Sequence, residues 1–341
     1  MRPAIFHCMR LIFLLVLLLS VVGGSAQIFP ALGSQRAGIS ALTFLNLDLS
    51  PRSAALGGAN LCLSSDAFGA ALNPAALADV QGVSVGASHT FWAADIDYSF
   101  LSVAKSTNAG VFGVSVSGLN SGAMPVRTTF QPEGTGELFY AYYITAGISY
   151  ARRLTDQFSW GTNVRYVREQ LAEFTANTAV VDLGFLYDTD FNDLKFAVAI
   201  KNFGGNSTLQ GEVALDTTFS NKPLNLESYP APTVFQLGLS IVPWKKEDGS
   251  QSLTTHLQLN HPNDNAENIR IGAEYAYRDL LFLRAGYKLN VNDQPFPTAG
   301  IGVRMRLGSF PFRFDYAFEQ LQFLGTIHRV GINIDFYKET R

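Results

Sequence analysis

The sequence has few cysteines, few charges and a single long apolar run. Its 341 residues include two cysteines, Cys8 and Cys62, and charged residues make up 16% of the chain. We expect Cys8 to be removed with a signal peptide, so that Cys62 has no cysteine to pair with. A disulfide framework and a zinc site both need further Cys or His residues, and none lies near Cys62. We interpret Cys62 as a small buried apolar residue rather than a reactive thiol.

The apolar run lies at the N-terminus, where Leu11 to Val22 follow two arginines and precede small residues that end at Ala26. This arrangement is typical of a secretory signal peptide, and the run is too short to cross a bilayer as a helix. We expect a signal peptide at residues 1–26, with cleavage before Gln27. Beyond it no run of about eighteen apolar residues occurs, so we expect no transmembrane helix.

Charge and composition narrow the class of protein further. Two of the 25 Lys and Arg residues lie in the expected signal peptide, which leaves 23 against 28 Asp and Glu residues. This acidic balance disfavours nucleic acid as a partner. Aromatic residues make up 12% of the chain and glycines number 30, which favours many strands and tight turns. Two classes remain, a soluble all-β protein and an outer-membrane β-barrel.

From Val83 onward, apolar residues alternate with polar or small ones, the period-two pattern of strands with two different faces. We predict about fourteen strands. Their expected ranges are 83–89, 98–105, 111–118, 143–152, 159–168, 178–187, 194–202, 233–243, 252–260, 268–277, 281–288, 298–307, 311–318 and 326–336. A soluble sandwich would alternate in the same way, so this pattern alone does not separate the two classes.

Strand length and aromatic positions favour the barrel. The predicted strands approach the roughly 9 to 11 residues that a tilted strand needs to cross a bilayer, whereas soluble strands commonly have about five or six. Trp92, Trp160 and Trp244 lie at strand ends, as in the aromatic girdles of membrane barrels. An arginine that faces lipid at the midplane costs about 2 to 4 kcal/mol. The arginine-bearing strand faces must therefore point into the lumen, where carboxylates such as Glu274 can pair with them.

Loop lengths agree with a barrel whose N-terminus lies in the periplasm. In such a barrel, each connection from an even strand to the next odd strand is a short periplasmic turn. The predicted connections follow this rule, and the long loops, 119–142 and 203–232, both fall on the opposite side. Loops of this length are commonly functional, and we expect protein contacts there.

The last predicted strand has a further barrel signature. Arg329, Gly331, Ile334 and Phe336 have a spacing of polar, glycine and apolar residues that resembles the insertion signal of outer-membrane barrels. Residues 337–341 follow as a C-terminal tail. We predict an all-β fold, a transmembrane antiparallel β-barrel at residues 81–336.

Residues 27–80 do not alternate and are too rich in alanine, glycine and apolar residues for a solvated tail. We expect them to form a plug with short helical turns inside the lumen, including a short helix that Ser65 or Asp66 caps and Pro74 ends. The marked plug residues are Arg52, Gly57, Gly58, Asn73 and Pro74. We expect Arg52 to pair with a lumen carboxylate and the Asn73 side chain to hold the bend before Pro74.

This order of motifs, an arginine before Ala-Leu-Gly-Gly-Ala and then Asn-Pro-Ala ahead of the first strand, resembles the plug of FadL-like barrels. It is most similar to the PorV/PorQ branch, as is the segment from Gln258 to Tyr275. The resemblance covers residues 41–336. It implies a fourteen-stranded outer-membrane barrel that acts as a scaffold or cargo shuttle in type IX protein secretion and surface attachment.

The same resemblance implies secreted cargo proteins or attachment-complex components as partners, bound by a monomeric barrel within a larger complex. The candidate contact surface is an expected extracellular turn with the polar residues His261, Asn263, Asp264, Asn265 and Glu267. The alternative is a FadL-type transporter of hydrophobic small molecules, which predicts an apolar pocket beside the plug. Both hypotheses place the exported protein in the outer membrane, surrounded by lipid.

We expect no enzymatic activity, no cofactor and no metal. Residues 82–86 match Gly-x-Ser-x-Gly around Ser84, but a nucleophile elbow needs a sharp strand-to-helix turn and a histidine base, and these residues begin a strand. His256 and His261 lie close to acidic residues in sequence, yet their spacing fits no metal motif. The Asn and Asp residues around Pro262 favour a polar turn instead.

Overall fold

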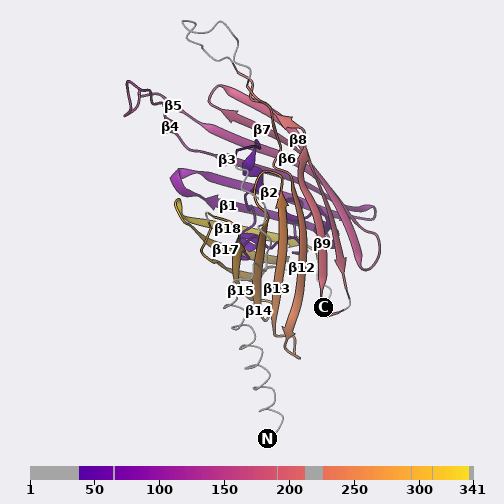
Figure 1. The fold of residues 1–341 in the computed structure, drawn as a ribbon. Helices are drawn as coiled ribbons and strands as arrows, with labels where there is room; N and C mark the ends of the chain where they lie inside the picture. The colour runs from indigo at the N-terminus through magenta and orange to yellow at the C-terminus, as the bar shows by residue number, and fades with distance from the viewer. Residues whose placement is uncertain are drawn as a thin grey trace, which may run out of the picture. The chain divides into compact units, whose positions relative to one another are not determined.

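The computed structural model describes residues 38–63, 66–189, 191–211, 226–292, 294–308 and 310–337. Within them, fourteen antiparallel strands form a closed barrel (Figure 1). The bounds are β1 Val83–Phe91, β2 Asp97–Thr107, β3 Gly110–Asn120, β6 Ala141–Arg153, β7 Phe158–Leu171, β8 Phe174–Asp188, β9 Lys195–Gly204, β12 Val234–Lys245, β13 Gln251–Pro262, β14 Asn268–Tyr277, β15 Leu281–Leu289, β16 Thr298–Leu307, β17 Phe310–Leu321 and β18 Gly325–Phe336. The predicted fold class is confirmed, and every expected strand overlaps an observed one.

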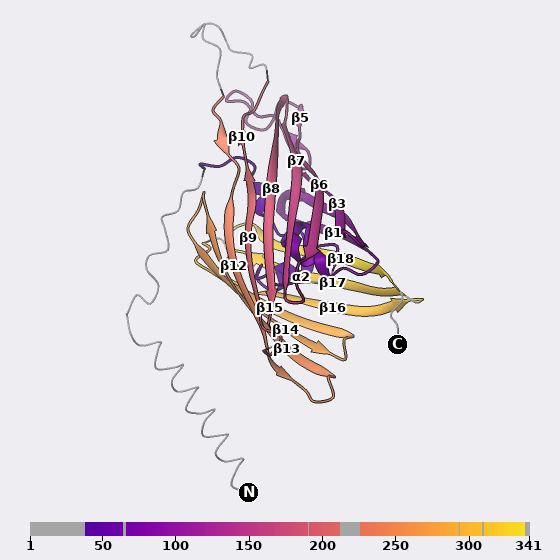
Figure 2. The same ribbon diagram turned by 90° about the vertical axis from the view of Figure 1, so that its right-hand side faces the viewer.

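The barrel closes between its first and last strands. β1 pairs with β18 over nine residues, from Val83 opposite Phe336 to Phe91 opposite His328. Every other pair joins consecutive barrel strands in antiparallel register. Closure leaves no unpaired edge strand in the wall, as a membrane-spanning sheet requires. Figure 2 shows the strands wrapped around the short elements of the N-terminal segment.

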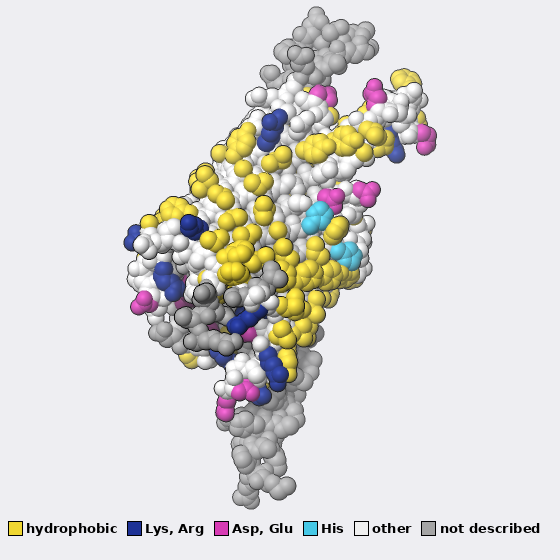
Figure 3. All heavy atoms as spheres, turned by 180° about the vertical axis from the view of Figure 1, so that it is seen from behind, with side chains coloured by type: hydrophobic (Ala, Val, Ile, Leu, Met, Phe, Trp, Pro, Cys, Tyr) yellow, Lys and Arg dark blue, Asp and Glu magenta, His cyan; other side chains and the backbone are white. Residues whose placement is uncertain are grey.

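The two strand faces point as a membrane barrel requires. On β17, Arg313 and Asp315 are buried inside the barrel, whereas Phe314 between them is 39% exposed on the outside. Ile148 on β6 and Val164 on β7 are likewise exposed on the outside of the barrel. Figure 3 shows hydrophobic side chains across much of one outer face. The apolar strand faces therefore cover the exterior, which excludes the soluble sandwich with its apolar faces packed together.

The long loops on one side of the barrel contain two small hairpins. β4 (Met124–Pro125) pairs with β5 (Leu138–Phe139), and β10 (Asn206–Ser207) pairs with β11 (Tyr229–Pro230). The first hairpin projects beyond the neighbouring strands (Figure 1). Part of the second long loop, residues 212–225, lies outside the described residues.

The helical elements are short, and among the described residues none is long and apolar enough to span a membrane. They are η2 Thr43–Asn46, α2 Pro51–Ala55, α3 Gly69–Leu72, η3 Pro74–Asp79 and η4 Ala93–Asp95. The first four belong to the N-terminal segment, called the plug below (residues 38–63 and 66–80). The expected short helix is α3, which ends before Pro74, but its N-cap is Phe68 and no side chain caps it. Asp66 Oδ1 instead accepts from the Phe68 N–H, one residue before the helix begins. The expected signal peptide and residues 338–341 lie outside the described residues.

Candidate functional site

The Asn73 side chain joins two segments of the plug, at Leu61 and at the start of η3. Its Oδ1 accepts a hydrogen bond from the Ala75 backbone N–H at 3.1 Å and so caps η3, with Pro74 in the first helical position. Its Nδ2 donates to the Leu61 carbonyl oxygen at 2.9 Å. The barrel wall leaves room for this side chain only because position 184 is glycine, where a Cβ would lie 2.0 Å from Asn73 Oδ1. The residue is fully buried.

Gly57 and Gly58 let the plug backbone turn directly against the wall. Both have positive φ angles, 67° and 76°, which side chains other than glycine adopt at a cost. A Cβ at Gly57 would lie 2.8 Å from the Tyr287 backbone nitrogen of β15. A Cβ at Gly58 would overlap the Arg270 guanidinium. The glycine pair therefore serves both the turn and the close approach.

Arg52 on α2 links the plug to the wall. Its Nη2 donates to Glu274 Oε1 at 2.7 Å and its Nε donates to Glu274 Oε2 at 3.0 Å, which is bidentate geometry. Glu274, on β14, is 6% exposed. The same carboxylate also accepts from Arg284 of β15, so one buried acid binds two arginines from distant parts of the chain.

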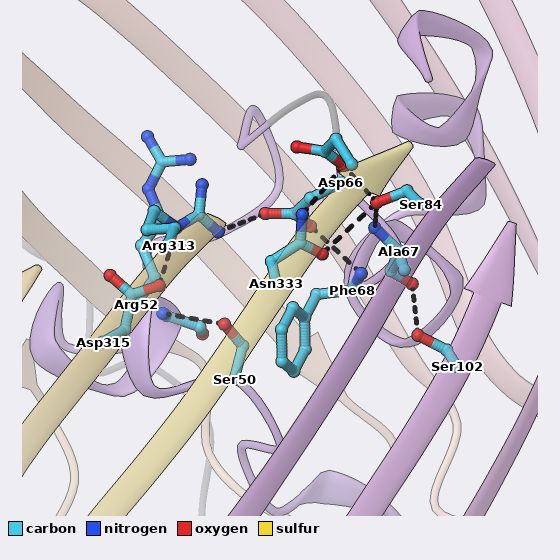
Figure 4. A network of polar contacts seen from close by, with 12 residues as sticks. Ser50, Arg52, Asp66, Ala67, Phe68, Ser84, Ser102, Arg313, Asp315 and Asn333 are labelled. Carbon is cyan, nitrogen blue, oxygen red and sulfur yellow. Dashed lines mark hydrogen bonds and ion pairs between the residues drawn. The ribbon is translucent and has the colours of Figure 1, made fainter. Parts of the chain in front are cut away.

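The ion pairs continue across the lumen as a network. It begins at Arg52 and ends at Asp66, and both residues belong to the plug. Arg284 Nη1 donates to Asp315 Oδ1 at 2.6 Å, and Arg313 Nε donates to Asp315 Oδ2 at 2.7 Å. Arg313 then binds Asp66 of the plug, as Figure 4 shows. Removal of one member would leave a buried charge without its partner, which is costly at low dielectric constant.

Polar wall residues also bind the plug backbone directly. Gln258 Oε1 accepts from the N–H groups of Asn60 and Leu61 at 2.9 and 3.0 Å. The donors to plug carbonyl oxygens include Ser102 to Ala67 (Figure 4), Asn163 to Ala70, Lys201 to Ala71 and Thr298 to Ala55. These donors come from strands on different sides of the barrel, so the wall fixes the plug from several directions.

A cavity of about 610 Å³ lies beside the plug, toward the side of the long loops. Its cationic lining residues are Arg165, Lys201, Arg270, Lys288 and Arg329, and its carboxylates are Asp48, Asp264 and Glu319. The plug adds apolar surface from Leu45, Leu47, Leu49 and Leu72, and amide side chains supply much of the remainder. A pocket beside the plug is what the transporter hypothesis predicts, but its lining is mainly polar rather than apolar.

Lys201 and Asp48 are cavity residues that no motif in the sequence marks. Lys201 has the same parity on β9 as the buried Ala197 and Ala199, and this parity is the signal that could have placed it in the lumen. Asp48 lies in a plug segment without periodicity, so no pattern in the sequence predicts which way its side chain points.

The residues of the candidate contact turn lie in two environments, the exposed surface and the cavity. His261 and Asn265 are exposed, and His261 Nδ1 lies 2.9 Å from Glu267 Oε1. Asn263 Nδ2 donates to the Ala231 carbonyl oxygen at 3.1 Å. Asp264 instead faces the cavity, where burial raises the pKa of its carboxyl group. The exposed part is a candidate contact surface, whereas Asp264 belongs to the cavity.

The residues of the expected insertion signal lie along β18. Arg329 donates to Glu319 at 2.6 Å inside the barrel. A Cβ at Gly331 would lie 2.9 Å from Pro51 Cγ, so this glycine makes room for α2. Ile334 is partly exposed, and Phe336, which is exposed, packs against Phe310 at 5.2 Å between ring centroids. Arg329 and Gly331 thus face the inside of the barrel, where one forms an ion pair and the other leaves space for the plug.

No catalytic or metal-binding arrangement forms around the residues weighed for those roles. The Ser84 hydroxyl donates to Asp335 and accepts from the Ala67 N–H, neither of which is a histidine (Figure 4 labels Ser84 and Ala67). His256 is 5% exposed in the wall, and neither of its ring nitrogens has a hydrogen-bond partner. The described part of the chain contains no group of three or more His, Cys, Asp or Glu residues placed to hold a metal ion.

Cys62 lies in the plug as a free, buried cysteine, which confirms its interpretation as a buried residue. It packs with Leu61, Ala75 and Leu186. Burial raises the pKa of its thiol to about 12. The side chain therefore stays protonated and unreactive at neutral pH.

The closed wall, the apolar exterior and the interior plug define a plugged transmembrane β-barrel. No model of a known protein family matches the chain. No curated protein matches it in sequence either.

Solved structures with the same architecture are FadL-like outer-membrane barrels. The toluene transporter TodX of Pseudomonas putida has a TM-score of 0.56 at 14% identity, over 84% of this chain and 97% of that one. The toluene transporter TbuX of Ralstonia pickettii gives 0.51 at 13% identity, over 84% and 97%. A FadL homologue of Pseudomonas aeruginosa gives 0.52 at 11% identity, over 88% and 100%. At these identities the similarity shows the fold, a fourteen-stranded FadL-like barrel.

Proposed function

We propose that this protein is an outer-membrane transporter of the FadL type, in which the plug controls the passage of a small molecule through the barrel. The observation that carries the proposal is the cavity of about 610 Å³ that opens beside the plug. This volume is in the range of small-molecule sites. A second pocket, of about 130 Å³, is lined by residues such as Asp79, Arg304 and Asp335, and the two pockets share no lining residue. We infer that a solute that enters the cavity passes only when the plug moves.

The structural neighbours support transport more than secretion. TodX and TbuX are described as toluene transporters, and they share the fold of this chain. Hydrophobic small molecules are accordingly one substrate class to test, beside the polar solutes that the mainly polar lining of the cavity would suit. An enzymatic role is not part of the proposal, because these neighbours are transporters and Ser84 lacks a histidine base.

The outer membrane is the location that fits the proposal. The exterior of the wall carries large exposed apolar residues such as Val116, Ile148 and Leu257, which suit a lipid environment. The expected signal peptide at residues 1–26 would supply the export step. Its cleavage before Gln27 remains a prediction.

The second candidate is a scaffold or cargo shuttle of the PorV/PorQ kind in type IX secretion. It is supported by the motif order in the plug and by the segment from Gln258 to Tyr275. One structural observation also favours it, because Phe130, in the loop between β4 and β5, is 96% exposed. An apolar side chain in that position suits contact with a protein partner. The partners would be secreted cargo or attachment-complex components.

Reconstitution into liposomes tests the proposal. Proteoliposomes that contain the folded barrel are mixed with small solutes, including toluene, and solute entry is followed. Entry above that of protein-free liposomes supports transport. If every solute stays outside, while gentle extraction from the native membrane recovers a bound protein, the scaffold replaces the transporter.

A further inference from the structure

Two cations of the cavity, Lys201 and Arg270, have no carboxylate partner among the described residues. Lys201 Nζ donates to the Ala71 carbonyl oxygen at 2.6 Å. Arg270 donates to Asn268 Oδ1 at 3.2 Å and to the Gly58 carbonyl oxygen at 3.3 Å. Within the described residues, neither side chain forms an ion pair at 4.0 Å or less. Both line the cavity, so two positive charges face it with only neutral oxygens as partners.

The other cations of the lining do not offset this excess. Arg165 pairs with Asp182 at 2.8 Å. Lys288 and Arg329 share one carboxylate, that of Glu319, at 2.7 and 2.6 Å. The Lys288, Arg329 and Glu319 group therefore keeps a positive balance as well.

The two remaining carboxylates only partly compensate. Asp48 Oδ1 already accepts from Ser53 at 2.7 Å and from Asn60 at 3.3 Å within the plug. Asp48 attracts Lys201 and Lys288, but the positive charge of Arg270 repels both. Asp264 is the other carboxylate, and burial makes it harder to ionise. The summed field in the cavity is therefore attractive to an anion.

The lining also contains buried acceptors that lack donors. Asn60 and Gln236 are 4% and 6% exposed, and in the described part of the chain the side-chain oxygen of each has no hydrogen-bond partner. Both residues line the cavity. A buried acceptor without a donor costs free energy, and ligand hydroxyl groups would supply such donors.

We propose that the cavity binds a small organic anion that carries hydroxyl groups, such as a sugar acid. The carboxylate lies between Lys201 and Arg270, and the hydroxyl groups donate to amide oxygens such as those of Asn60 and Gln236. Charge-assisted hydrogen bonds to arginine and lysine are stronger than neutral ones. This inference rests on the proposed function, because it names the class of solute that the transporter binds in its cavity.

Calorimetry on the full-length barrel in detergent tests binding, with gluconate as the probe and glucitol as its neutral analogue. Gluconate binds, and glucitol binds at least about tenfold more weakly, which corresponds to about 1.4 kcal/mol. The double variant Lys201→Gln/Arg270→Gln loses this preference. The control Lys245→Gln/Lys246→Gln removes the same charge from exposed positions outside the cavity and keeps it. Arg270→Lys, which retains the charge, keeps most of the affinity even if the double variant does not fold.

Uptake by proteoliposomes separates the inference from the proposed function. Faster entry of gluconate than of glucitol supports both. Calorimetric binding of gluconate without entry of any solute supports the anion site and overturns transport. Entry of solutes without preference, together with no heat of gluconate binding, leaves transport standing and overturns the anion site.

Discussion

Glu274 is a wall carboxylate that joins an arginine of the plug to an arginine of the wall. It binds Arg52 of the plug and Arg284 of the wall, and it is almost fully buried. Glu274→Gln leaves Arg52 without an anion and leaves Arg284 with Asp315 alone, so we expect a loss of about 3 kcal/mol in the free energy of unfolding. Urea titration followed by tryptophan fluorescence measures it.

The control for this change is an ion pair on the surface, where both side chains are exposed to solvent. Lys246 and Asp248 pair at 2.9 Å with side chains that are 50% and 54% exposed. Lys246→Gln should change the free energy of unfolding by no more than about 0.5 kcal/mol, because exposed pairs contribute little. Equal effects of the two substitutions would contradict the structural role of Glu274.

Gly57 gives a second test at the residue scale, because Gly249 has nearly the same backbone conformation. Their φ angles are 67° and 68°, but a Cβ at Gly249 meets nothing within 4 Å, whereas one at Gly57 meets Tyr287 at 2.8 Å. Gly249→Ala carries only the cost of the left-handed conformation, about 1 to 2 kcal/mol. Gly57→Ala adds the overlap, so its thermal midpoint should fall further. Similar midpoints would show that the plug does not press on β15.

Individual contacts were harder to predict than residue roles. The need of Arg52 for a carboxylate follows from the cost of an unpaired charge inside a barrel. Its partner, Glu274, lies 222 residues away in the sequence, and no local pattern selects it from the other lumen acids. The bond from Lys201 to the Ala71 carbonyl oxygen is also long-range, because it joins residues 130 positions apart.

At the scale of elements, the strands were predictable because each carries its own signal. The alternation of apolar and polar residues predicts β14 and β16 with the observed bounds, since every second side chain must face lipid. The two small hairpins were not predicted, because two-residue strands such as β4 are too short to show a period. The lining of the cavity was missed for another reason: it combines plug residues without periodicity and residues from many strands.

The turn between β13 and β14 provides a prediction about pH. Burial raises the pKa of Asp264 above its ordinary value of 3.8, so the stabilising protonated form is present at low pH and is lost as the pH rises through the folded-state pKa. Asp264→Asn removes the cost of the buried charge at pH 7. We expect its thermal midpoint to exceed that of the wild type at pH 7, and the difference to vanish below about pH 3.8.

Asp248 is the control with the opposite sign. Hydrogen bonds from Ser250 and Lys246 hold the pKa of this exposed carboxyl group well below its usual range, so its ionised form is the stabilising one. Asp248→Asn should therefore lower the midpoint slightly at pH 7 and have no effect at low pH. An Asp264→Asn variant that behaves in the same way would mean that Asp264 is solvated.

At the scale of the whole molecule, the barrel is a wall built around a filled lumen. The plug is tied to the wall by the charge network and by hydrogen bonds to its backbone, and it contributes residues to the cavity and, through Asp79, to the small pocket. The fold class follows from the sequence pattern, but the presence of a large polar cavity does not, because it depends on how the plug fills the lumen.

The central claim, that solute passes only when the plug moves, is tested most directly by a reversible crosslink. An ideal Cβ at Gly86 of β1 lies 3.3 Å from the Cβ of Ala67, close to the roughly 3.5 to 4.5 Å of disulfides. Cys62 does not compete, because burial raises its thiol pKa to about 12. The measurement is solute entry into proteoliposomes that contain Ala67→Cys/Gly86→Cys, before and after reduction. Entry should be lost in the oxidised protein and restored by the reductant, whereas equal entry in both states would contradict the account.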